Sequence, residues 1–155
     1  MADINRILYT TDFSDLSAGA LDYAVFLARK CGAQLHAVYV VDDSYQYWMS
    51  FDLATIPAGP PLADLTAGAQ KQMQEFLRTR LPADVPAISK ILHGRPFLEI
   101  IRYARDEKMD LIVIGTHGRS GLRHVLMGSV AEKVVRKSPC PVLTVRHPGH
   151  EFEMP

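Results

Sequence analysis

Residues 111–130 read LIVIGTHGRSGLRHVLMGSV, and this stretch decides the fold class of the chain. The aliphatic run at 111–114 is typical of a buried β-strand, and Gly128 and Ser129 open a helix that we expect to reach Lys137. Residues 115–130 contain four glycines, two arginines and two histidines but no carboxylate. A strand that runs through a glycine-rich loop into a helix is typical of parallel α/β sheets.

The same alternation of strand and helix extends outward from this stretch. We expect strands at residues 6–10, 34–41, 87–92, 111–114 and 141–145 from their short β-favouring runs. We expect helices at residues 16–30, 62–81, from 96 past 104, and 128–137 from their apolar spacing. Ser14 or Asp15 should cap the first helix and Gly32 should end it. This order predicts an α/β protein with a mostly parallel sheet covered by helices on both faces.

The composition is that of an ordinary globular protein of 155 residues, with 48% apolar and 22% charged residues. Lys plus Arg equals Asp plus Glu at 17 each, so net charge favours neither nucleic acid nor an anionic membrane as a partner. The chain shows no secretory signal and no membrane-length apolar run. Cys31 and Cys140 have no metal-ligand spacing and are expected to be free thiols in a reducing cytoplasm. We therefore expect one cytoplasmic domain at residues 1–147 and a tail at 148–155.

Residues 42–61 form a long segment without clear periodicity, which is unusual within a compact domain. It carries the aromatic residues Tyr45, Tyr47, Trp48 and Phe51. These side chains are candidates for a lid over a ligand, or for packing on the sheet edge or a partner subunit.

Two polar strand ends suggest a binding crevice. In a sheet of order 3-2-1-4-5, the strands that end before Thr11-Asp12 and at Gly115 are neighbours where the strand order reverses, which is where such sheets bind ligands. Gly115 and Gly118 could adopt positive φ and turn the chain around a phosphate. The helix opened by Gly128-Ser129 offers free N–H groups to the same anion.

Other residues near these strand ends suit the rest of a nucleotide. Arg119 could lie over the rim of the phosphate site, and Asp12 can accept hydrogen bonds from a ribose hydroxyl or an adenine amino group. Val40, at the end of the second strand, offers backbone groups and an apolar wall to a base. The alternative is purely structural: the glycines make tight turns, Ser129 caps its helix, and Asp12 caps the first helix.

The stretches RILYTTDFS, HAVYVVD and DLIVIGTHGRSGLRHVLMGSVAEKVVRKSPCPVLTV resemble the universal stress protein family over nearly the whole chain. The spacing Gly115-x2-Gly118-x9-Gly128-Ser129 is similar to the G-x2-G-x9-G-[ST] pattern of the family's ATP-binding branch. The resemblance implies a single-domain, Rossmann-like, adenine nucleotide α-hydrolase-like fold with an open five-stranded parallel sheet of order 3-2-1-4-5. It also implies a homodimer joined along the last strand, Pro141 to Val145.

Carried over by position, the resemblance implies a set of nucleotide-binding residues. These are Thr10, Thr11, Asp12, Val40, Gly115, His117, Gly118, Arg119, Ser120, Gly128, Ser129 and Val130. Thr10 departs from the family pattern, because many ATP-binding relatives carry proline there.

The signals for catalysis are poor. The chain has neither the GxxxxGK[ST] loop nor the GxGxxG fingerprint, and no catalytic residues or protein metal site stand out. Mg²⁺, if used, would be held largely through phosphates and waters. We expect an ATP- or AMP-binding stress sensor or regulator with at most slow turnover. A slow ATPase using the same crevice and a dimeric interaction module without nucleotide are the alternatives.

Overall fold

The computed structural model describes residues 3–43, 59–116 and 128–146. The strands are β1 (Arg6–Thr10), β2 (Gln34–Val41), β3 (Ala87–His93), β4 (Leu111–Gly115) and β5 (Val142–Val145). The helices are α1 (Asp15–Cys31), α3 (Leu62–Arg80), α4 (Pro96–Asp106) and α5 (Ser129–Lys137). The expected aromatic segment around Trp48 and the tail at 148–155 lie outside the described residues.

The five strands form one parallel sheet of order β3-β2-β1-β4-β5. The two central pairings set the register, with Tyr9 beside Ala37 of β2 and beside Val113 of β4. Both the expected fold class and the expected strand order are confirmed. The order reverses between β1 and β4, because the chain moves outward to β3 on one side and to β5 on the other.

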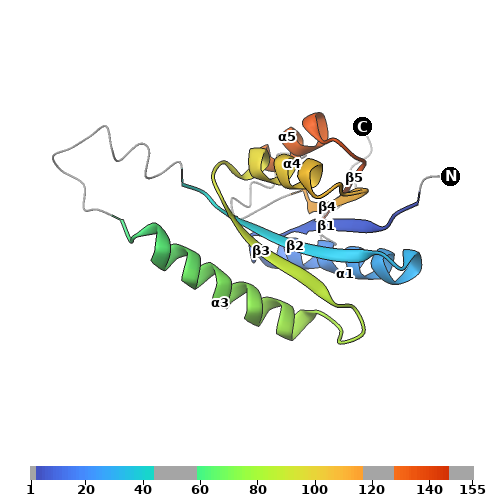
Figure 1. Cartoon of the computed structure of the whole chain (residues 1–155), viewed down its shortest axis with the longest axis horizontal. Helices are drawn as coiled ribbons and strands as arrows, with labels where there is room; N and C mark the ends of the chain where they lie inside the picture. The colour runs from blue at the N-terminus through green and yellow to red at the C-terminus, as the bar shows by residue number, and fades with distance from the viewer. Residues whose placement is uncertain (1–2, 44–58, 117–127, 147–155) are drawn as a thin grey trace.

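Helices cover both faces of the sheet, as Figure 1 shows, with α1 and α3 on one face and α4 and α5 on the other. Buried residues fall into two corresponding clusters. Tyr9, Leu21 and Met73 belong to the cluster under α1 and α3, whereas Leu8, Ile112 and Val134 belong to that under α4 and α5. Alternate residues of β1 therefore serve opposite cores, as expected for a central strand of a doubly covered sheet.

The ends of α1 follow from its sequence. The Ser14 hydroxyl accepts a hydrogen bond from the Ser17 backbone N–H at 3.2 Å, so Ser14, not Asp15, is the N-cap. Gly32 follows the helix with φ of 65°, a left-handed conformation that glycine adopts with little steric cost. Pro96 stands in the first turn of α4, where its missing N–H leaves no intrahelical hydrogen bond unmade.

Three strand boundaries differ from the sequence-based expectation. Strand β3 ends at His93, one residue later than expected. Gly115 is the last residue of β4 and pairs with Val145, so it is not the first residue of a turn. Strand β5 begins at Val142 because Pro141 has no N–H to donate, although the Pro141 carbonyl still accepts from the Ile112 N–H at 3.0 Å. Cys31 and Cys140 are free thiols, as expected. Among the described residues, no helix is long and apolar enough to cross a membrane.

Candidate functional site

The candidate site lies at the edge of the sheet where β1 and β4 end. These strands are hydrogen-bonded neighbours, with Ile7 beside Leu111 and Tyr9 beside Val113. Extending this register by two residues brings Thr11 next to Gly115. The two polar strand ends that the sequence singled out therefore meet at the reversal of strand order, where open α/β sheets bind their ligands.

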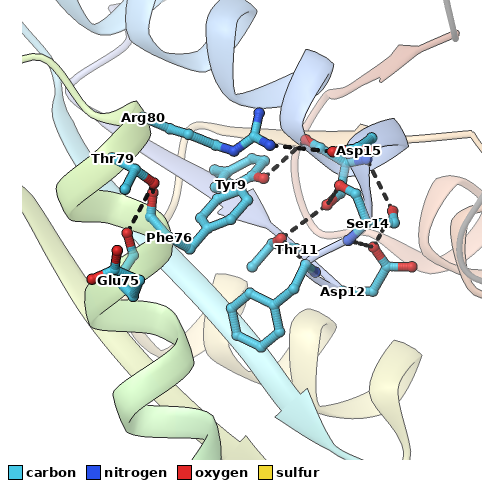
Figure 2. Close-up of polar contacts among 11 residues, drawn as sticks. Tyr9, Thr11, Asp12, Ser14, Asp15, Glu75, Phe76, Thr79 and Arg80 are labelled. Atoms are coloured by element: carbon cyan, nitrogen blue, oxygen red, sulfur yellow. Dashed lines mark hydrogen bonds and ion pairs between the residues drawn. The ribbon is translucent and has the colours of Figure 1, made fainter.

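The turn after β1 is held by a chain of hydrogen bonds, drawn in Figure 2. The Ser17 hydroxyl donates to the Ser14 carbonyl at 2.8 Å. Because that uses the only proton of Ser17 Oγ, the Thr11 hydroxyl must be the donor in its 2.9 Å contact with Ser17 Oγ. Thr11 Oγ1 in turn accepts from the Phe13 N–H at 2.9 Å. The buried hydroxyl of Thr11 is thus committed to the fold.

The Asp12 carboxylate is oriented by Ser14. Asp12 Oδ1 accepts hydrogen bonds from the Ser14 backbone N–H at 3.0 Å and from the Ser14 hydroxyl. The expectation that Asp12 caps α1 is therefore wrong, because Ser14 is the cap and Asp12 holds that cap residue in place. Ionised carboxylates are acceptors only and have about four lone-pair sites, so Asp12 keeps the acceptor chemistry that a ribose hydroxyl or adenine amino group requires.

Tyr9 stabilises this turn. Its hydroxyl donates to the Ser17 carbonyl at 2.9 Å, and its side chain is fully buried. Burial raises the pKa of Tyr9 to about 12, so the phenol stays protonated and keeps donating near neutral pH. This contact ties the first turn of α1 to the C-terminal half of β1.

The second half of the site is the junction between β4 and α5. The Gly128 N–H donates to the Thr116 carbonyl at 2.5 Å, and the Thr116 N–H donates to Val145 at 2.9 Å. These bonds place the start of α5 against the end of β4. Gly128 is the N-cap and provides no side-chain hydrogen bond, so the first-turn N–H groups of α5 are not capped by that residue. A helix N-terminus in this state favours an anion.

Two further expectations at this junction are resolved by the backbone. The alternative that Ser129 caps α5 is wrong, since Ser129 is the first helical residue and Gly128 holds the cap position. Positive φ at Gly115 is also wrong: among the described glycines, only Gly32 and Gly94 have positive φ. Gly115 lies in the extended ladder with Val145, where any residue can adopt the backbone conformation.

Val40 lies on the other side of β1. The backbone hydrogen bonds between β1 and β2 extend to the Thr11 N–H and the Val38 carbonyl at 3.0 Å. Val40 is two residues further along β2, and strand alternation turns its backbone toward the β1 side. Its side chain is 8% exposed and packs in the core under α4 and α5. Because the Val40 side chain is buried, the groups of Val40 that can contact a base are mainly those of its backbone.

The structure brings together eight of the twelve expected site residues at this edge. They are Thr10, Thr11, Asp12, Val40, Gly115, Gly128, Ser129 and Val130. His117, Gly118, Arg119 and Ser120 lie outside the described residues and stay predictions. Sequence reasoning missed the roles of Phe13, Ser17 and Thr116. Of these, only Ser17 had a local signal, three residues after a serine cap.

Metal ligands do not gather in this part of the chain. No group of three or more His, Cys, Asp or Glu side chains with metal-binding geometry occurs within residues 3–43, 59–116 and 128–146.

The sheet order and the polar edge at its reversal define a doubly wound, Rossmann-like α/β protein. The profile of the Universal stress protein family matches residues 3–146. The chain belongs to the universal stress protein family.

Individual relatives agree with this assignment. Universal stress protein MJ0531 of Methanocaldococcus jannaschii is 35% identical over 150 residues, covering 94% of this chain and 84% of the relative. The solved structure of protein MJ0577, from the same organism, is similar with a TM-score of 0.78 at 29% identity, covering 95% of this chain and 99% of that one.

Two more distant structures of the same fold contain nucleotides. One is a universal stress protein in complex with cAMP, at 23% identity and a TM-score of 0.59, covering 93% of this chain and 98% of that one. The other is a universal stress protein from Archaeoglobus fulgidus in complex with dAMP, at 21% identity and a TM-score of 0.60, with the same coverage. At these identities the likeness concerns the fold alone.

Proposed function

We propose that this chain binds an adenine nucleotide, ATP or AMP, where β1 and β4 end, and that occupancy of the site serves a sensing or regulatory role. One observation carries the proposal. The bond between Gly128 N–H and Thr116 O sets the N-terminus of α5 against the end of β4, at the reversal of strand order. The cAMP and dAMP bound by two proteins of the same fold are consistent with this ligand class.

The phosphates would bind at the start of α5. The first intrahelical bond of α5 runs from the Glu132 N–H to the Gly128 carbonyl, so the N–H groups of Ser129, Val130 and Ala131 have no partner within the helix itself. Together with the helix dipole they favour negative charge. Ser129 is exposed and adds a hydroxyl donor. His117, Gly118, Arg119 and Ser120 are proposed to complete the phosphate contacts from the adjoining loop.

The nucleoside would extend from there across the end of β1. Asp12 is proposed to hold a ribose hydroxyl or the adenine amino group, with its carboxylate already oriented by Ser14. Val40 is proposed to contact the base through its backbone. Thr10 and Thr11 are 8% and 7% exposed, so we expect their contribution to come from backbone groups near the ligand.

The proposal includes binding with little turnover. Phosphoryl transfer requires positioned metal ions and a group that orients the nucleophile, and the chain has no P-loop lysine. We also propose a cytoplasmic homodimer joined along residues 141–145, because β5 forms an edge of the sheet and pairing with its own copy would cover it.

The first experiment identifies the ligand directly. Freshly purified protein is denatured, and released nucleotide is identified by chromatography and mass spectrometry. A thermal-shift titration with ATP, ADP and AMP follows. A ligand at about 100 times its Kd stabilises by about 2.7 kcal/mol, which corresponds to a rise in Tm of roughly 5–11 °C for a domain of this size.

Gly128→Val tests the location of the site. Gly128 has φ of −65° and ψ of 155°, which valine adopts readily, so the variant should fold while its side chain blocks close approach of a phosphate. Gly68→Val on the exposed face of α3, where an added Cβ meets nothing within 4 Å, is the matched control. Equal nucleotide affinity in both variants would refute the proposed site.

The same variants separate the alternatives. Metal-dependent ADP production that is present in the parent and lost in Gly128→Val would favour a slow ATPase. Neither released nucleotide nor any thermal shift in the parent would favour the interaction module.

A further inference from the structure

Phe13 has an unusual backbone conformation for its residue type. Among the described residues, Phe13 and Lys108 are the non-glycine positions with positive φ, at 63° and 52°. A bulky side chain in this region is sterically unfavourable, so the surroundings must hold it there. Phe13 directly follows Asp12, and residues held in this way often serve a binding site.

The ring of Phe13 is anchored by two other aromatic side chains. Its centroid lies 4.5 Å from that of Tyr39 on β2 and 5.8 Å from that of Phe76 on α3, the latter with an edge-to-face angle of 67°. Phe76 is held in turn by Arg80, whose guanidinium lies 5.3 Å from the ring and pairs with Asp15 at 3.2 Å. Figure 2 shows Phe76 and Arg80 on one side of the turn and Asp12 on the other.

The backbone at Phe13 determines where the Asp12 carboxylate can bond. The peptide that carries the Ser14 N–H is oriented by the Phe13 dihedral angles, and that N–H donates to Asp12 Oδ1 at 3.0 Å. On the other side of the residue, the Phe13 N–H donates to Thr11 Oγ1 at 2.9 Å. If Phe13 relaxed to negative φ, the peptide would rotate and Ser14 would no longer hold the carboxylate in this direction.

We propose that Phe13 is a positioning residue for nucleotide binding. Its ring, packed between Tyr39 and Phe76, keeps the backbone at residue 13 left-handed, and this conformation fixes the direction of the Asp12 carboxylate. The inference rests on the proposed function, because it assigns to Phe13 the geometry of that same site. Because Phe76 of α3 contacts Phe13, a change at Phe76 should also alter how well the Asp12 side of the turn discriminates between ligands.

The test measures discrimination rather than affinity alone. Dissociation constants are measured by calorimetry for ATP, for 2′,3′-dideoxy-ATP, which lacks the ribose hydroxyls, and for purine riboside triphosphate, which lacks the amino group. A hydrogen bond to an oriented carboxylate corresponds to roughly tenfold or greater discrimination, so the parent should reject at least one analogue by that factor. In Phe13→Ala this discrimination should fall below about threefold, while the Kd of the rejected analogue changes little. Phe13→Tyr should restore the discrimination of the parent.

Two further variants complete the design. Phe26→Ala removes a ring that is 55% exposed on α1 and should leave discrimination unchanged. Phe76→Leu removes a ring that contacts Phe13, and should give an intermediate value. If Phe13→Ala does not fold, Phe76→Leu provides the test of the inference.

The outcomes separate this inference from the proposed function. If Phe13→Ala and Phe76→Leu weaken ATP and its analogues equally, the cluster only stabilises the fold and the inference is overturned. A parent that binds ATP without rejecting either analogue overturns the role of Asp12, and with it the inference, but leaves nucleotide binding intact. A parent that binds no nucleotide overturns both.

Discussion

Replacing Thr11 by valine should destabilise the protein without creating a cavity. The side chain is 7% exposed, and valine has nearly the same shape, so the main change is loss of the hydroxyl. That hydroxyl donates to Ser17 Oγ and accepts from the Phe13 N–H, both at 2.9 Å. Each hydrogen bond contributes about 0.5–1.5 kcal/mol net, so Thr11→Val should lower the free energy of unfolding by about 1–3 kcal/mol. A loss of about 2 kcal/mol lowers Tm by roughly 4–8 °C in a domain of this size.

The assay is urea unfolding followed by far-UV circular dichroism, with calorimetry for Tm. Thr79→Val is the control, because Thr79 is exposed on α3 and its hydroxyl donates to the carbonyls of Glu75 and Phe76 in its own helix. We expect this control within about 0.5 kcal/mol of the parent. If Thr11→Val is no less stable than Thr79→Val, the hydrogen-bond chain after β1 does not contribute as argued.

Two further predictions concern stability away from the site. Burial lowers the pKa of His36 below 6.5, with Arg6 and Lys90 acting in the same direction and Glu107 opposing them. As the pH falls, the unfolded chain therefore protonates His36 before the folded protein does, so the free energy of unfolding should be highest above pH 6.5 and decrease below it. Urea unfolding midpoints measured from pH 8 to 5 should fall less in His36→Gln than in the parent. Gly32→Ala should destabilise by about 1 kcal/mol because φ is 65°, whereas Gly68→Ala in the interior of α3 should stabilise by up to about 1 kcal/mol; the opposite order of Tm values would contradict the backbone argument.

Most of the fold could be predicted from local patterns. The alternation of short β-favouring runs with amphipathic helices identified every described element, and Gly32 and Pro96 fixed two helix boundaries. The strand order could not be obtained in this way, because periodicity does not say which strands pair. That order came from the family resemblance, and the ladders confirm it.

The candidate site was predictable only in part. The polar ends of two strands were expected to meet where the strand order reverses, and the ladder between β1 and β4 confirms that they do. The reason given for Gly115 was wrong, because the register with Val145 keeps it extended. The left-handed Phe13 has no local sequence signal, since its conformation depends on Tyr39 and Phe76, which are distant in the chain. Likewise, the sequence does not show that the Thr11 hydroxyl bonds to Ser17 Oγ, because this contact depends on where the first turn of α1 lies relative to the end of β1.

The bond between Gly128 and Thr116 has a consequence for protein engineering. The chain leaves β4 at Thr116 and enters α5 at Gly128, and these two residues are hydrogen-bonded with 2.5 Å between the donor and acceptor atoms. The two ends of the segment that joins them therefore lie side by side. The entropy of closing such a segment grows slowly with its length, by about 0.6 kcal/mol per doubling. A foreign peptide grafted between Thr116 and Gly128 would replace residues 117–120, so we expect it to keep β4 and α5 as its frame but to lose the proposed phosphate contacts.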